Sequence, residues 1–125
     1  MPTRRVISKV VYSKALKPVI WLGSSRDAVR DFPPLARKAA GQALTAVQFG
    51  LPPPDSKPMT SIGSGVVEIR MHVGGEFRVV YVAKYVEAVY VLHAFEKRTQ
   101  RTRQGDLELA RSRLRVAERS RRAQD

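Results

Sequence analysis

A run of alternating apolar and polar residues at positions 66–73 constrains the fold of this chain more than any other feature of its sequence. Its apolar members occupy every second position: Val67, Ile69, Met71 and Val73. This period of two is typical of a β-strand that buries one face. Gly74 and Gly75 then favour a tight reversal, and a second alternating run begins at Phe77. We therefore predict a β-hairpin at the centre of the fold.

The length of the hairpin loop decides which side chains share a face. A two-residue loop would mix apolar and charged side chains on both faces, whereas a three-residue loop of residues 74–76 makes one face wholly apolar. Because a slip of one residue exchanges the two faces, we expect the three-residue loop. This register pairs Val73 with Phe77, His72 with Arg78 and Arg70 with Val80. It predicts that four polar side chains stand together on the second face: Glu68, Arg70, His72 and Arg78.

Composition limits the class of protein and the kind of partner. A chain of 125 residues, 43% of them hydrophobic, is expected to form one domain with a modest core. The net charge of +12, from 23 Lys and Arg against 11 Asp and Glu, favours a polyanionic partner: nucleic acid first, an acidic protein second and an anionic membrane third. With no cysteine and two histidines, we expect no disulfide, metal site or cofactor. No apolar run approaches the roughly 20 residues that span a bilayer, so we expect a cytoplasmic protein.

Local patterns predict the remaining elements in chain order. We expect a basic, poorly ordered arm at residues 1–17, a strand at 19–22, a short helix from Ser24 to Phe32, a helix at 35–49, an edge strand at 57–62, a strand buried on both faces at 88–95, a basic loop at 96–104, a helix capped by Asp106 and a frayed tail at 119–125. The domain proper then spans residues 18–118. This order predicts an α+β fold, with two N-terminal helices on a small, largely antiparallel sheet of four to five strands and a further C-terminal helix.

Four strings of this sequence, in this order, resemble one known family. They are VIWLGSSRDAVRDFP, GLPPPDSKPM, VVEIRMHVGGEFRVVYVAKY and VYVLHAFEKRTQRTRQGDLELARSRL. Together they resemble the HigB-like, phage-associated branch of the RelE/ParE toxins of type II toxin-antitoxin systems, over residues 17–115. The resemblance implies a RelE-like fold and a toxin that is neutralised by a cognate antitoxin, expected to be a helix-turn-helix protein.

The same resemblance implies two activities between which the fold does not choose. RelE and HigB types are endoribonucleases that cleave mRNA, usually on the ribosome, whereas ParE types inhibit DNA gyrase. We expect a ribosome-dependent mRNA interferase that inhibits translation without a metal, with mRNA and the ribosome as partners and neither a membrane nor a small-molecule cofactor. The alternatives are a ParE-like gyrase inhibitor and a non-catalytic nucleic-acid-binding module, for which the positive charge alone would suffice.

The RelE pattern of basic residues carries over to specific positions of this chain. Arg70 matches the second basic residue of the strand before the turn, Arg78 matches the arginine after it, and Lys97 with Arg98 match the later basic set. Two departures stand out. Glu68 occupies the position of the first basic residue, and no tyrosine follows Tyr90 to match the C-terminal tyrosine of the pattern.

Cleavage of RNA without a metal has three chemical requirements, and we assign one or more of these residues to each. The 2′-hydroxyl must lose a proton, the charge on phosphorus must be stabilised, and the leaving 5′-oxygen must gain a proton. We expect Arg70 and Arg78 to stabilise the phosphate, Glu68 or His72 to act as the base, and His93 or His72 as the acid. The basic residues that follow are expected to contact RNA phosphates: Lys97, Arg98, Arg101 and Arg103. The alternative for the hairpin is a solvated sheet face with cross-strand ion pairs, and for His93 a hydrogen-bonded core residue.

Overall fold

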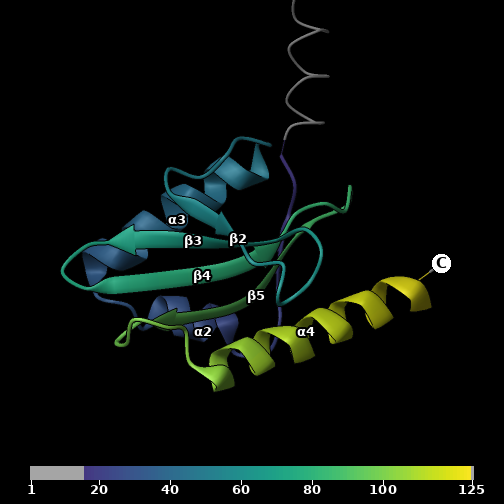
Figure 1. Cartoon of the computed structure of the whole chain (residues 1–125). Coiled ribbons are helices and arrows are strands. Elements are labelled where there is room, and N and C mark those ends of the chain that lie inside the picture. The colour runs from purple at the N-terminus through teal and green to yellow at the C-terminus, as the bar shows by residue number, and fades with distance from the viewer. Residues whose placement is uncertain (1–15, 125) are drawn as a thin grey trace, which may run out of the picture.

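The computed structural model describes residues 16–124, which form a mixed sheet with helices on both faces (Figure 1). The elements are β1 (Val19–Trp21), α2 (Ser25–Arg30), α3 (Pro34–Gln48), β2 (Ser56–Pro58), β3 (Val66–His72), β4 (Glu76–Val82), β5 (Val89–Glu96) and α4 (Gln104–Ala123). The predicted α+β class is confirmed. All but the last two residues of the expected basic arm, residues 1–17, lie outside the described part of the chain.

The sheet has the strand order β1-β5-β4-β3-β2. β1 pairs with β5 in parallel, and the other three pairings are antiparallel, so the sheet is largely antiparallel as predicted. β5 lies inside the sheet with residues 89–94 buried, which explains its nearly continuous apolar sequence. β2 forms the opposite edge and is shorter than the expected strand at 57–62, because the chain turns away after Pro58.

The hairpin joins β3 and β4 through a three-residue loop, but the loop lies one residue earlier than predicted. His72 pairs with Glu76 and Arg70 with Arg78, so the loop consists of residues 73–75. The predicted pairs of His72 with Arg78 and of Arg70 with Val80 are therefore wrong. Each residue of β3 faces a partner two positions away from the expected one, and this leaves the division into two faces unchanged. The shift places Glu76 within the ladder, where its carboxylate bonds the His72 ring.

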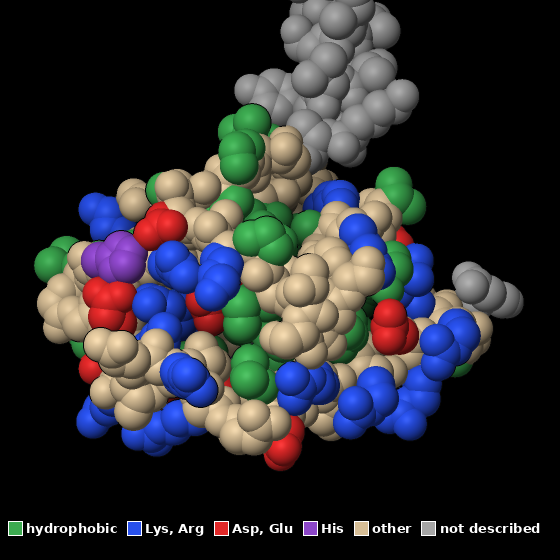
Figure 2. All heavy atoms as spheres, viewed as in Figure 1, with side chains coloured by type: hydrophobic (Ala, Val, Ile, Leu, Met, Phe, Trp, Pro, Cys, Tyr) green, Lys and Arg blue, Asp and Glu red, His purple; other side chains and the backbone are tan. Residues whose placement is uncertain are grey.

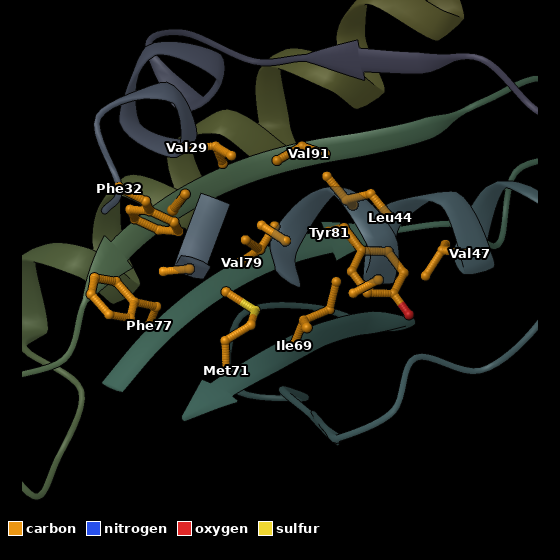
Figure 3. Packing of buried hydrophobic residues seen from close by; sticks show 14 of the residues in the cluster. Val29, Phe32, Leu44, Val47, Ile69, Met71, Phe77, Val79, Tyr81 and Val91 are labelled. Atoms are coloured by element: carbon orange, nitrogen blue, oxygen red, sulfur yellow. The ribbon is translucent and has the colours of Figure 1, made fainter. Parts of the chain in front are cut away.

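The apolar face of the sheet is covered by α2 and α3 (Figure 3). Pro34 opens α3, where its missing N–H costs no hydrogen bond, and Gly50 follows its end with a φ of +80°. The small side chains of Ala36, Ala40 and Ala43 let α3 approach the sheet closely. The sheet contributes Ile69, Met71, Phe77, Val79, Tyr81 and Val91 to this core. Tyr81 is thus a core residue, and its burial raises the pKa of its hydroxyl.

The second face is covered by α4 over part of its area. Ala110, Leu114 and Ala117 of α4 pack on an apolar group of sheet residues that includes Val66, Val80, Val82 and Leu92. The polar side chains of β3 and β4 lie on the same face, nearer the hairpin loop. Among residues 16–124, no helix combines the length and apolar character needed to cross a membrane.

Two expected helix caps are absent because their side chains bond other partners. Asp106 does not cap α4, which begins at Gln104; instead its carboxylate bonds His93 from the first helical turn. Ser24 holds the position before α2 without a side-chain capping bond, and its hydroxyl accepts a hydrogen bond from Arg113. α4 continues to Ala123, so the helix extends beyond the expected domain boundary at residue 118.

A β-bulge in β5 redirects its last residues. Val80 pairs with His93 whereas the adjacent Tyr81 pairs with Val91, so Leu92 is the extra residue. Without the bulge, strict alternation would place His93 on the face of Val91; with it, His93 lies on the face of α4. The carbonyl of the extra residue accepts a hydrogen bond of 3.0 Å from Arg113 Nη1, so α4 stabilises the bulge.

Candidate functional site

An open cavity of about 400 Å³ lies beside the first turn of α4, on the face of the sheet that α4 covers in part. It is bounded by β2, β3, the loop after β5 and the first turn of α4. Its lining residues are Lys57, Met59, Ser61, Glu68, Arg70, Lys97, Gln100, Arg101, Thr102, Gln104 and Leu107. Figure 2 shows this face of the molecule, on which lysine and arginine side chains gather to the left of and below the central apolar atoms.

Glu68 is the acidic residue of this lining, and its side chain is only 3% exposed. One of its oxygens, Oε1, lies 3.7 Å from Arg70 Nε and 3.6 Å from Arg78 Nε, which is too far for a hydrogen bond. The other oxygen, Oε2, has no hydrogen-bond partner among the described residues. Two arginine side chains therefore lie beside the carboxylate, while Oε2 keeps its lone pairs without a partner among the described residues.

Arg70 and Arg78 pair across β3 and β4 on the same face, yet their surroundings differ. Arg70 lines the cavity and its side chain is 32% exposed. Arg78 is 5% exposed and does not line the cavity. Its Nη1 donates to the Phe77 carbonyl at 2.9 Å and its Nη2 to Glu76 Oε1 at 3.1 Å. The structure thus leaves Arg70 accessible to a ligand and uses Arg78 as a buried cation beside Glu68.

His72 lies on the same face but outside the cavity lining, near the hairpin loop. Its Nδ1 contacts Glu76 Oε1 at 2.8 Å and its Nε2 contacts Asp55 Oδ2 at 2.7 Å. These hydrogen bonds to Glu76 and Asp55 raise the pKa of His72. The hydrogen bond to His72 and a second one from Arg78 lower the pKa of Glu76. Both ring nitrogens are occupied by carboxylates, so His72 joins the hairpin to the chain before β2.

His93 is buried between β5 and α4 and does not line the cavity either. Its Nε2 lies 2.7 Å from Asp106 Oδ1, its Nδ1 lies 3.4 Å from Arg113 Nη1, and its ring stacks on Phe95. These contacts agree with the alternative interpretation of His93 as a hydrogen-bonded core residue. They also connect α4 to the sheet.

The basic loop after β5 divides between the cavity and the surrounding surface. Lys97 and Arg101 line the cavity, whereas Arg98 pairs with Glu96 at 2.9 Å and, like Arg103, lies outside the lining.

Sequence reasoning missed one basic residue of the cavity lining, Lys57, which pairs with Glu68 across β2 and β3. The sequence places this lysine on the expected edge strand, but no local pattern shows which residue of β3 it faces. Its place beside Glu68 could therefore not be predicted.

Four basic side chains therefore line the cavity together with one buried carboxylate: Lys57, Arg70, Lys97 and Arg101. Such a lining suits an anionic ligand with more than one charged group, since several cations attract successive phosphates. Among residues 16–124, no group of three or more His, Asp or Glu side chains could hold a metal ion. The chemistry that the described side chains themselves offer is proton transfer and binding of anionic oxygen atoms.

Comparison with known families matches one family model to a segment that contains the whole cavity. The model described as phage derived protein Gp49-like (DUF891) matches residues 27–115, a segment that contains every residue of the cavity lining. None of the curated proteins matches this sequence. Because the match covers more than half of the chain, the protein belongs to the phage-derived Gp49-like family, whose members are toxin-like proteins of the RelE kind.

Proposed function

We propose that this protein is the toxin of a type II toxin-antitoxin system and that it inhibits translation by cleaving mRNA, as HigB-like ribosome-dependent toxins do. One observation carries the proposal: the buried Glu68 carboxylate lies in a cavity whose other charged residues are all basic. A phosphodiester needs cations for its phosphate and a base for its 2′-hydroxyl, and this cavity offers both in one place.

In the proposed reaction, Glu68 takes the proton of the RNA 2′-hydroxyl. The 2′-oxygen forms a bond to phosphorus, the bond between phosphorus and the 5′-oxygen breaks, and the products are a 2′,3′-cyclic phosphate and a 5′-hydroxyl. Arg70 stabilises the charge that develops on the phosphate oxygens, since its planar fork can bind two of them. The leaving oxygen takes its proton from Lys57 or Lys97, the lysines of the cavity lining.

Residues around the reacting groups take supporting roles in this proposal. Arg78 does not touch the substrate and is a positioning residue, because its guanidinium lies beside Glu68 beneath the cavity. Arg101 binds a phosphate next to the scissile one. A cognate antitoxin, expected to be a helix-turn-helix protein, neutralises the toxin by covering the cavity, and the reaction takes place on ribosomes in the cytoplasm.

The proposal is tested by two substitutions in the cavity and two matched ones outside it. Glu68→Gln should lower the rate of mRNA cleavage in a ribosome-containing translation reaction about 10²- to 10⁴-fold, as loss of a general base does. Arg70→Ala should abolish growth inhibition while the thermal unfolding curve stays close to that of the wild type. Glu96→Gln and Arg98→Ala remove the same charges from a pair outside the cavity lining and should leave cleavage unchanged.

Three results would contradict the proposal. One is full cleavage by both cavity variants, which would place the reaction elsewhere. The second is growth inhibition with intact transcripts and impaired DNA supercoiling, which would favour a ParE-like gyrase inhibitor. The third is RNA binding without cleavage on ribosomes, which would leave only a nucleic-acid-binding module.

A further inference from the structure

The arginines of α4 fall into two groups that differ in their partners. Arg113 and Arg121 serve the fold: the first bonds Leu92 and Ser24, and the second pairs with Glu87 and lies over the ring of Tyr85. The other group is exposed or half-exposed, and within residues 16–124 its members form no ion pair: Arg111, Arg115, Arg119 and Arg122. The fold therefore leaves most of the positive charge of α4 uncompensated.

Three of these arginines share one flank of the helix with the cavity. Arg111 and Arg122 lie seven and eighteen residues after Gln104, which is close to two and five full helical turns, and Arg115 lies one turn beyond Arg111. Gln104 lines the cavity, and Arg111 Nε donates to the carbonyl of Ser61, another lining residue, at 2.9 Å. We call Arg111, Arg115 and Arg122 the arginine flank.

The arginine flank continues the positive charge of the cavity along α4. From Arg111 to Arg122 it covers eleven residues, or roughly 16 Å at the helical rise. Figure 2 shows lysine and arginine side chains along the lower part of this face, following α4 toward its C-terminal end. Two acidic residues lie on this side: Glu118 accepts a hydrogen bond from Tyr85 at 3.1 Å, and the exposed Glu108 accepts one from Gln104 at 3.3 Å. Neither forms an ion pair with the arginine flank within residues 16–124.

The chemistry of the flank fits a chain of phosphates better than a protein. A protein interface of ordinary affinity has an apolar centre, and the exposed apolar residues of α4, Leu109 and Val116, lie on its other side. A row of exposed arginines along one flank instead suits the repeated negative charge of a nucleic-acid backbone. A single strand that leaves the cavity past Gln104 meets the flank directly.

We infer that the arginine flank binds the backbone phosphates of the RNA strand whose scissile linkage occupies the cavity. This inference rests on the proposed function for the identity of the strand. It gives α4 the role of binding the part of the RNA that lies outside the cavity, so that long RNAs bind more tightly than short ones.

The test compares binding of two RNAs that cannot be cut because their 2′-hydroxyls are methylated. The triple variant Arg111→Gln, Arg115→Gln, Arg122→Gln should bind a dodecanucleotide with a weaker salt dependence than wild type, the slope of log K against log salt falling by about 2 at roughly 0.7 per lost phosphate contact. Its affinity for a trinucleotide, which reaches little beyond the cavity, should stay unchanged. The control variant Arg26→Gln, Arg37→Gln, Lys38→Gln removes three exposed charges from α2 and α3, across the sheet, and should keep the wild-type slope.

Three outcomes would overturn the inference: equal slopes for the α4 variant and wild type, an equal loss in the control variant, or unchanged RNA binding with lost binding of the antitoxin. The first two outcomes would mean that these arginines contribute to RNA binding only through the net charge of the protein. The third would mean that they form a protein interface. Because the probes cannot be cleaved, a failure of the proposed nuclease activity leaves this measurement intact.

Discussion

Replacing Arg78 with methionine removes the more deeply buried of the two cations beside Glu68 and keeps an unbranched side chain in the same space. Removing one partner of a buried ion pair costs about 3–5 kcal/mol, because the remaining charge is left without compensation. Arg70 still lies 3.7 Å from Glu68, so we expect the lower end, about 3 kcal/mol. For a domain of this size such a loss lowers the melting temperature by about 10 °C.

The neighbouring arginine provides a direct comparison. Arg70 faces Arg78 across the ladder and is one-third exposed, so Arg70→Met should cost no more than about 1 kcal/mol. The double variant Glu68→Met, Arg78→Met removes both buried charges and should regain most of the stability that Arg78→Met loses. The single variants Glu68→Met and Arg78→Met form a cycle with this double variant, in which we expect a coupling free energy of about 2 kcal/mol.

Urea and thermal unfolding followed by circular dichroism measure the stability of all five proteins: the wild type, the three single variants and the double variant. If Arg78→Met melted like the wild type, or if the double variant were no more stable than Arg78→Met, Glu68 would not depend on Arg78 and the assignment of Arg78 as a buried positioning residue would fail.

Three further substitutions test other parts of the structure. The pKa of His72 is raised above its ordinary 6.5, so its bonds to two carboxylates stabilise the fold fully below that pH and are lost as pH rises through the higher folded value; the difference in melting temperature between wild type and His72→Gln should shrink with rising pH. The pKa of Glu87 is lowered from 4.5 to about 2, chiefly by its bond to Arg121, so this contribution is complete above pH 4.5 and disappears as pH falls toward 2. Glu87→Gln should accordingly speed amide exchange in the last turns of α4 at neutral pH and lose this effect in acid. Arg113→Met leaves the buried Leu92 carbonyl without its donor and should destabilise the fold by about 1–3 kcal/mol in urea unfolding.

The hairpin shows how far sequence reasoning reaches in this protein. Alternation of apolar residues in β3 and β4 predicted both strands and both faces correctly, because burial of one face acts on every second residue. The position of the loop was missed by one residue. Glu76 can join the ladder because its carboxylate bonds His72 and Arg78, and such tertiary contacts have no local signal.

Arg70 and Arg78 show where sequence reasoning about the site stops. Both are arginines on the same face of one hairpin, and the resemblance to RelE-like toxins gave them the same expected role. Their difference in exposure comes from the strands and loops around them, above all from the cavity that opens between β2, β3 and α4. The same is true of His93, whose side chain is turned toward α4 by a bulge at Leu92 that an apolar run cannot reveal.

The chemistry of the cut ends tests the central claim most directly. Purified protein is added to a translation reaction, and the ends of the cleaved mRNA are identified by enzymatic treatment and mass spectrometry. Attack by the 2′-oxygen, with Glu68 as base, predicts 2′,3′-cyclic phosphate and 5′-hydroxyl ends in the wild-type reaction and their loss with Glu68→Gln. Ends with a 3′-hydroxyl and a 5′-phosphate, or undiminished cleavage by Glu68→Gln, would contradict the account.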